Sequence, residues 1–121
     1  MVAINFKAQF ADAVAGGEKC QTIRKLGKLT PRPGNTLQLY TGQRTKFCRL
    51  LKETICLTVQ DVLITDDSLI NELVLTLDGK RLLFTEARAI ALADGFDSLV
   101  LMRDFFKDLY GFPFEGVLIC W

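Results

Sequence analysis

The sequence GEKCQTIR, residues 17–24, lies between a segment with a helical pattern and a segment with a strand pattern. In the preceding residues 8–15, apolar side chains recur at helical spacing, and the glycines at 16 and 17 predict the end of that helix. Residues 19–24 mix polar and β-branched side chains, which is typical of a strand. This part of the chain therefore predicts a helix that turns directly into a strand.

The side chains of Lys19 and Thr22 can meet only if the strand is irregular or begins after Lys19. Lys19 and Thr22 are three positions apart, so a regular strand would point them to opposite faces. They converge if Lys19 lies in the turn before the strand, or if a bulge separates the two residues. Thr22 and Arg24 are two positions apart and share a face without any irregularity.

The rest of the chain contains short strand patterns separated by turns. Strands are expected at residues 3–6, 36–40, 54–64, 71–77, 80–84 and 116–121. In the longest of them, Ile55, Leu57 and Val59 are expected on one face, with Cys56 opposite. Asp78-Gly79 is typical of a two-residue hairpin turn between two of these strands.

Two further helices are expected near the C-terminus. Thr85 is the predicted N-cap of a helix at 86–93, and Asp97 or Ser98 is predicted to cap a helix at 99–110. This order of elements favours an α+β chain with a mostly antiparallel sheet, curled or closed into a small barrel. With 121 residues, the chain is expected to form a single domain.

The composition excludes several classes of protein. No apolar run reaches the length of about 18 residues that spans a membrane. The chain has no histidine, which removes Ser-His-Asp and Cys-His nucleophile systems and His-ligated metals. Its four cysteines form no C-x-x-C pair, so we expect free thiols in a reducing, cytoplasmic compartment, with neither a metal nor a cofactor.

The net charge of +1 hides an asymmetry along the chain. Nine basic residues and no acidic residue lie between Lys19 and Lys52, whereas residues 53–121 hold five basic and twelve acidic residues. This acid-free run predicts a one-sided positive surface, which favours a polyanion or a phosphate-bearing ligand. The alternative is a solvated basic face that binds no partner.

Three motifs, in order along the chain, resemble those of the ASCH domain family. Residues 17–24 are similar to that family's G-x-K-x-x-T-I-R pattern. Residues 33–40, PGNTLQLY, are similar to its P-G-D start of a strand, with Asn35 in place of Asp. Residues 93–98, ADGFDS, resemble its acidic-Gly-Phe turn before the last helix. The resemblance covers nearly the whole chain, is strongest to small bacterial and phage ASCH proteins, and implies a PUA-like small mixed β-barrel flanked by helices.

The resemblance also implies a catalytic site. Some small ASCH proteins are amidohydrolases that deacetylate N(4)-acetylcytidine with a Lys, a Thr and a Glu. By position, Lys19 and Thr22 match the first two, and the acidic member falls at Asp94. A threonine hydroxyl is a poor nucleophile at its free pKa, and without histidine a lysine of lowered pKa could serve as its base. The carboxylate of Asp94 would position a water or relay a proton.

Four further residues are predicted to bind the substrate, which would be RNA or a modified nucleoside: Gln21, Arg24, Tyr40 and Arg44. Arg24 would hold a phosphate or a carbonyl oxygen, and Tyr40 would stack on a base. The family also contains ribonucleases, so cleavage of RNA is an alternative activity. A third reading is a non-enzymatic, phage-type protein-interaction module that uses its positive face. If these residues carry no function, Lys19 is expected to be a solvated surface lysine and Asp94 an ordinary turn residue.

Overall fold

The computed structural model describes residues 1–67 and 72–121, and these residues form helices and strands. The elements in chain order are β1 (Val2–Phe6), α1 (Ala8–Gly16), β2 (Gln21–Lys25), β3 (Thr36–Thr41), β4 (Arg49–Ile55), β5 (Thr58–Asp67), β6 (Glu72–Leu77), β7 (Lys80–Arg81), α2 (Phe84–Ala93), α3 (Leu99–Tyr110) and β8 (Phe114–Cys120). The predicted α+β class is confirmed by this order.

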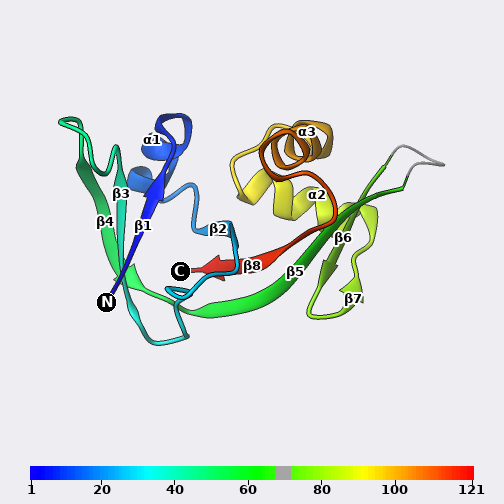
Figure 1. Ribbon diagram of the computed structural model, residues 1–121, viewed down its shortest axis with the longest axis horizontal. Coiled ribbons are helices and arrows are strands. Elements are labelled where there is room, and N and C mark those ends of the chain that lie inside the picture. Colours follow the sequence, from blue (N-terminus) through cyan, green and yellow to red (C-terminus); the bar gives the residue numbers. More distant parts are fainter. Residues whose placement is uncertain (68–71) are drawn as a thin grey trace.

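The strands form two sheets that meet at an angle (Figure 1). The smaller sheet has the order β1-β3-β4, with β1 parallel to β3 and β4 antiparallel to it. The larger sheet has the order β2-β8-β5-β6-β7 and is antiparallel throughout. The sheets are joined where β4 leads into β5, but the strands that the structure describes do not pair into the closed barrel that was expected.

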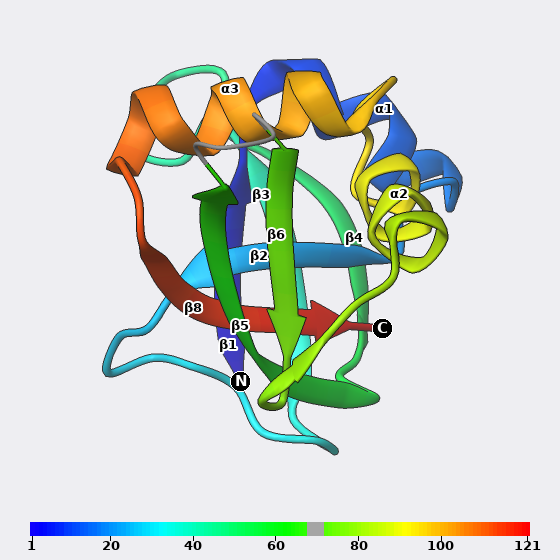
Figure 2. The same cartoon turned by 90° about the vertical axis from the view of Figure 1, so that its right-hand side faces the viewer.

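The helices cover the two sheets and complete the core (Figures 1 and 2). α1 contacts β3 and β4, whereas α3 contacts α2 and β6. The apolar face of α3 buries Met102 and Phe106, as its helical spacing requires. Strand residues Leu37 and Leu39 are fully buried beneath α1. Their alternation along β3 agrees with the predicted strand at 36–40.

The long strand predicted at residues 54–64 was wrong. A corner at Cys56 and Leu57 divides it into β4 and β5, and the structure adds the part of β4 that precedes residue 54. Cys56 donates its N–H to the carbonyl of Asn35, and its own carbonyl accepts from Gly34, both at 2.8 Å. These bonds turn the chain inward, so Cys56 is buried while Ile55 and Leu57 are exposed. The alternating pattern therefore crossed a corner, although Cys56 does lie opposite Ile55 and Leu57, as predicted.

The hairpin at Asp78-Gly79 is confirmed, since both residues have positive φ and Leu77 pairs with Lys80. The strand expected at 80–84 ends at Arg81, and α2 begins at Phe84. Thr85 therefore lies inside the first turn of α2 instead of capping it. Asn71, the first residue of the strand expected at 71–77, lies outside the described residues.

The cap of α3 is Ser98, whose hydroxyl accepts a hydrogen bond from the N–H of Leu101 at 3.2 Å. Gly111 follows the helix.

The helices in the described part of the chain are all too short or too polar to cross a membrane. Within the same residues, no cluster of three or more Cys, Asp or Glu side chains could hold a metal ion.

Candidate functional site

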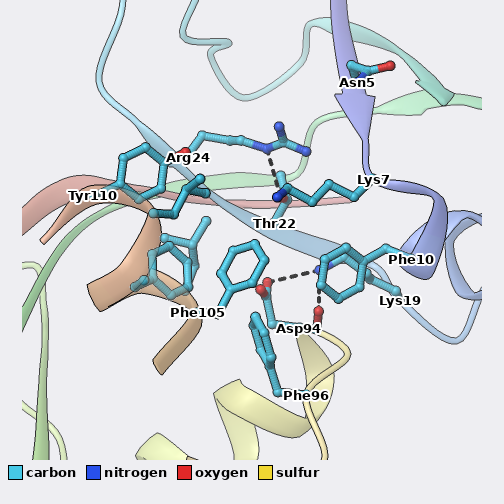
Figure 3. Close-up of a pocket in the computed structure, with 13 residues that line it drawn as sticks. Asn5, Lys7, Phe10, Lys19, Thr22, Arg24, Asp94, Phe96, Phe105 and Tyr110 are labelled. Carbon is cyan, nitrogen blue, oxygen red and sulfur yellow. Dashed lines mark hydrogen bonds and ion pairs between the residues drawn. The ribbon is translucent and has the colours of Figure 1, made fainter. Parts of the chain in front are cut away.

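A cavity of about 200 Å³ lies between α1, β2, α3 and the turn that joins α2 to α3 (Figure 3). Its lining combines charged groups with aromatic rings and consists of Asn5, Lys7, Phe10, Lys19, Thr22, Ile23, Arg24, Asp94, Phe96, Phe105, Phe106, Leu109 and Tyr110. Residues from both ends of the chain therefore meet at one place, around the stretch 17–24.

The floor of the cavity holds a buried ion pair between Lys19 and Asp94. The Lys19 Nζ lies 3.1 Å from Asp94 Oδ1 and also donates a hydrogen bond to the Asp94 main-chain carbonyl. The two residues are only 2% and 4% exposed. Charged side chains are rarely buried to this degree unless they are paired, so the pair requires a specific explanation.

The local sequence explains why Lys19 reaches this floor. Gly17 takes a left-handed conformation with φ of 86° and ends α1, and the N–H of Lys19 then donates to the carbonyl of Ala13 at 3.0 Å. Lys19 thus lies in the turn before β2, which begins at Gln21. This meets the condition under which Lys19 and Thr22 converge on one cavity.

Asp94 is held from two sides at the C-terminal end of α2. Its N–H donates to the carbonyl of Ile90 at 2.9 Å. The Gln21 side chain donates both to that same Ile90 carbonyl, at 3.2 Å, and to Asp94 Oδ1, at 3.3 Å. Gln21 is therefore a positioning residue that orients the carboxylate, rather than part of the cavity lining.

Burial acts against the charged form of both members of the pair. It lowers the pKa of Lys19, and the nearby Arg24 lowers it further, although Asp94 opposes the shift. Burial likewise raises the pKa of Asp94 against the opposing effects of Lys19, Gln21 and Arg24. Both directions favour the neutral amine and the neutral acid.

Thr22 and Arg24 form the second polar unit of the site. They point from the same face of β2, and the Arg24 Nε donates to the Thr22 hydroxyl oxygen at 2.9 Å. The guanidinium also lies over the ring of Phe6, 4.7 Å from its centroid, and burial lowers its pKa. Thr22 is 4% exposed, and it lines the cavity wall.

Aromatic rings form the remaining walls. Phe10, Phe96 and Phe105 meet edge to face, with centroids 5.2–6.1 Å apart. Lys19 lies over the ring of Phe10 at 5.0 Å, so the ammonium group is enclosed by carbon as well as paired with Asp94. Tyr110, at the end of α3, is about half exposed and stands at the rim. Such walls suit a flat, partly apolar ligand.

Gly95 lets the Asp94 turn approach these walls closely. Its φ is 98°, and a Cβ at this position would come within 3.0 Å of the Phe10 ring. Gly95→Ala is therefore expected to lower the free energy of unfolding by about 1–3 kcal/mol in urea denaturation. Gly27→Ala is the matched control, because a Cβ there meets nothing within 4 Å. Equal stability of the two variants would contradict this account.

Two predicted binding residues lie elsewhere. Tyr40 on β3 and Arg44 in the following turn do not line the cavity, so their prediction as substrate-binding residues receives no support from the geometry. Tyr40 follows Leu39, which is fully buried, and a strand points successive side chains to opposite faces. Arg44 is exposed, with a φ of 64°.

Several lining residues were not predicted. Lys7 directly precedes α1, and Phe10 lies on the apolar face of that helix. Tyr110 comes four residues after Phe106 on α3, so the two rings stack at 6.1 Å. Helical spacing does not identify these residues as cavity lining, because it does not show which elements α1 and α3 pack against.

The acid-free run is divided in space. The loop at 26–35 precedes β3 and the turn at 42–48 follows it, so their basic residues lie at opposite ends of that strand (Figure 1). Lys19 and Arg24 are drawn into the cavity instead. The basic residues of the run therefore fall into two groups at the two ends of β3, and Lys19 and Arg24 lie in the cavity.

Comparison of the chain with models of known protein families, with curated proteins and with solved structures finds no match.

Proposed function

We propose that the cavity binds a modified nucleoside by its base and hydrolyses the exocyclic amide of N(4)-acetylcytidine, free or within RNA. The observation that carries this proposal is the buried Lys19–Asp94 pair on the floor of an aromatic-walled cavity that also presents the Thr22 hydroxyl. Buried titratable pairs with shifted pKa values in a cavity are typical of catalytic sites. The resemblance of residues 17–24 and 93–98 to ASCH motifs supports the same activity.

The size and walls of the cavity support a single base as the bound group. At about 200 Å³ the cavity is smaller than the roughly 300–1,000 Å³ of pockets that enclose drug-sized ligands. A flat ring would stack against aromatic side chains such as Phe96 and Phe105, which is how proteins commonly hold unpaired bases. The sugar would then remain near the rim, beside Tyr110.

The proposed reaction begins with attack of the Thr22 hydroxyl oxygen on the acetyl carbonyl carbon. The neutral amine of Lys19 accepts the hydroxyl proton, and the Arg24 Nε–H, which already bonds to the Thr22 oxygen, stabilises the negative charge that develops there as the proton leaves. The C–N bond then breaks, Lys19 returns the proton to the departing cytosine amine, and the acetyl group stays on Thr22. A water then attacks the acetyl carbon and gives its proton to the amine of Lys19, which Asp94 holds in place. The bond between that carbon and the Thr22 oxygen breaks, Lys19 passes the proton to this oxygen, and the acetic acid that leaves ionises to acetate in water.

The hydrogen bonds of the ligand-free protein agree with one part of the proposed attack by Thr22 and not with another. Thr22 already accepts from Arg24, which favours the alkoxide over the hydroxyl. Lys19 is bonded to Asp94 and not to Thr22, so the proton transfer requires the substrate to draw Lys19 and Thr22 together. Asp94 replaces the Glu of the family pattern, and the turn at Gly95 brings its shorter side chain to within 3.1 Å of Lys19.

The resemblance further supports a PUA-like fold, in which the two curved sheets joined at Cys56 would correspond to an opened barrel. Under this proposal the protein acts in the cytoplasm on RNA or on nucleosides released from RNA, and it needs no metal or cofactor.

The test is release of cytidine from N(4)-acetylcytidine by the purified protein, followed across pH. The general base must be unprotonated, so the rate is expected to rise with pH. Its midpoint is expected below the ordinary lysine pKa of about 10.4, because burial lowers the pKa of Lys19. Absence of turnover at every pH would contradict the proposal, and a midpoint at or above the ordinary value would exclude Lys19 as the base.

A further inference from the structure

The cavity lining carries more positive than negative charge. Three cationic side chains, Lys7, Lys19 and Arg24, line it together with one carboxylate, Asp94. Asp94 is committed to Lys19 at 3.1 Å. The lining therefore carries an excess of positive charge that the floor pair does not balance.

The excess belongs to Lys7 and Arg24. Among residues 1–67 and 72–121, no carboxylate forms an ion pair with either side chain. Arg24 donates through Nε to Thr22, and its two terminal nitrogens have no hydrogen-bond acceptor in the described part of the chain. Lys7 lies over the Phe105 ring at 5.2 Å, which places its ammonium group at the same wall. A half-buried guanidinium whose two terminal nitrogens are free to donate is well suited to an oxyanion.

The charged side chains of the cavity differ in how deeply they are buried. Lys19 and Asp94 are buried at the floor, Arg24 is half-buried above them, and Lys7 is exposed at the rim. Figure 3 shows the side chain of Arg24 on the side of Thr22 that faces away from Asp94, and the side chain of Lys7 extending in the direction of Thr22. A base that enters with its exocyclic amide toward the floor leaves its sugar beside these two cations.

We infer that the substrate is a phosphorylated nucleoside, whose phosphate is bound by Arg24 and Lys7 at the rim of the cavity. This inference rests on the proposed function, since it assigns the base to the cavity and names the chemical form of the nucleoside. Arg24 then holds both the Thr22 hydroxyl, through Nε, and a phosphate oxygen, through its terminal nitrogens. The phosphate belongs either to a free mononucleotide or to an RNA strand.

The inference is tested by binding alone, with unacetylated probes that cannot turn over. Titration calorimetry would compare cytidine, cytidine 5′-monophosphate and cytidine 3′-monophosphate against the same protein. At least one monophosphate is expected to bind about tenfold more tightly than cytidine, the effect of one charge-assisted contact. A preference for the 5′ form points to free mononucleotides or a 5′ terminus, and a preference for the 3′ form to a phosphate that continues an RNA strand. The advantage is expected to shrink as salt is raised.

Lys7→Met separates a specific contact from general charge attraction. It is expected to remove most of the phosphate advantage, whereas Lys28→Met, at an exposed lysine outside the cavity, is expected to retain it. Equal affinities for cytidine and both monophosphates would overturn the inference and leave the proposed function standing. An advantage that persists in Lys7→Met, or that falls equally in Lys28→Met, would also overturn it. Failure of all three probes to bind would contradict both proposals.

Discussion

Lys19→Met is expected to lower the free energy of unfolding by about 3–5 kcal/mol at neutral pH, because it leaves the Asp94 carboxylate buried without its cation. Methionine fills a similar volume but cannot donate a hydrogen bond, so the main-chain carbonyl of Asp94 also loses its donor. Urea denaturation followed by circular dichroism measures the loss.

The pH dependence of this variant has a definite sign. Burial raises the pKa of Asp94, and without Lys19 the main opposing charge is gone. A group whose pKa is higher in the folded state stabilises the fold below its unfolded pKa, about 3.9 for Asp, and that stability is lost as pH rises through the folded pKa. The variant is therefore expected to be closest to the wild type in acid and to weaken as pH rises. An equal loss at all pH values would contradict the assignment of a buried carboxylate.

The single variant Asp94→Asn is expected to show the opposite trend. It leaves Lys19 buried with a lowered pKa, so its stability should increase as pH rises from the folded pKa toward the ordinary value of about 10.4. The double variant Lys19→Met/Asp94→Asn is expected to recover most of the stability lost in Lys19→Met, because neither remaining group is charged. Additive losses in the double variant would show that the two side chains do not form a coupled pair.

Thr22→Val is expected to reduce turnover of N(4)-acetylcytidine at least about 10³-fold, since it removes the proposed nucleophile and keeps the shape of the side chain. Stability should change little in comparison, because Val retains the strand preference of β2 and the Arg24 Nε at the cavity wall can bond to water. The measurement is the ratio of kcat values, with product separated by chromatography.

Thr22→Ser provides the matched control for that loss. Serine keeps a hydroxyl at the same position, within reach of the Arg24 donor, so it is expected to restore a substantial part of the rate. A Thr22→Val protein that turns over at the wild-type rate would exclude Thr22 as the nucleophile. Direct attack by a water activated at the Lys19–Asp94 pair would then be the remaining route.

The sequence predicted the local elements well where a strong stop signal was present. Gly17 and Gly111 mark the ends of α1 and α3, and Asp78-Gly79 forms the expected hairpin, because positive φ values at these positions depend on nearby residues only. The corner at Cys56 was missed because its partners, Gly34 and Asn35, are distant in sequence. A polarity pattern records which face is apolar but not where a strand bends.

The sequence predicted some residues of the site and missed others. The motif residues Lys19, Thr22 and Asp94 lie in one cavity, as the resemblance to ASCH motifs implied, and Arg24 shares the face of Thr22 through strand spacing alone. Tyr40 does not line this cavity, because its neighbour Leu39 takes the inward face of β3. The other missed lining residues depend on how helices pack across a sheet, which single-sequence patterns do not encode.

We propose that the buried Lys19–Asp94 pair is kept for chemistry and not for stability. The most direct test compares wild type with the double variant Lys19→Met/Asp94→Asn for both urea stability and release of cytidine from N(4)-acetylcytidine. We predict a double variant whose stability is close to that of the wild type and whose turnover is lost. Turnover that persists in the stable double variant, or is absent in the wild type, would contradict the claim.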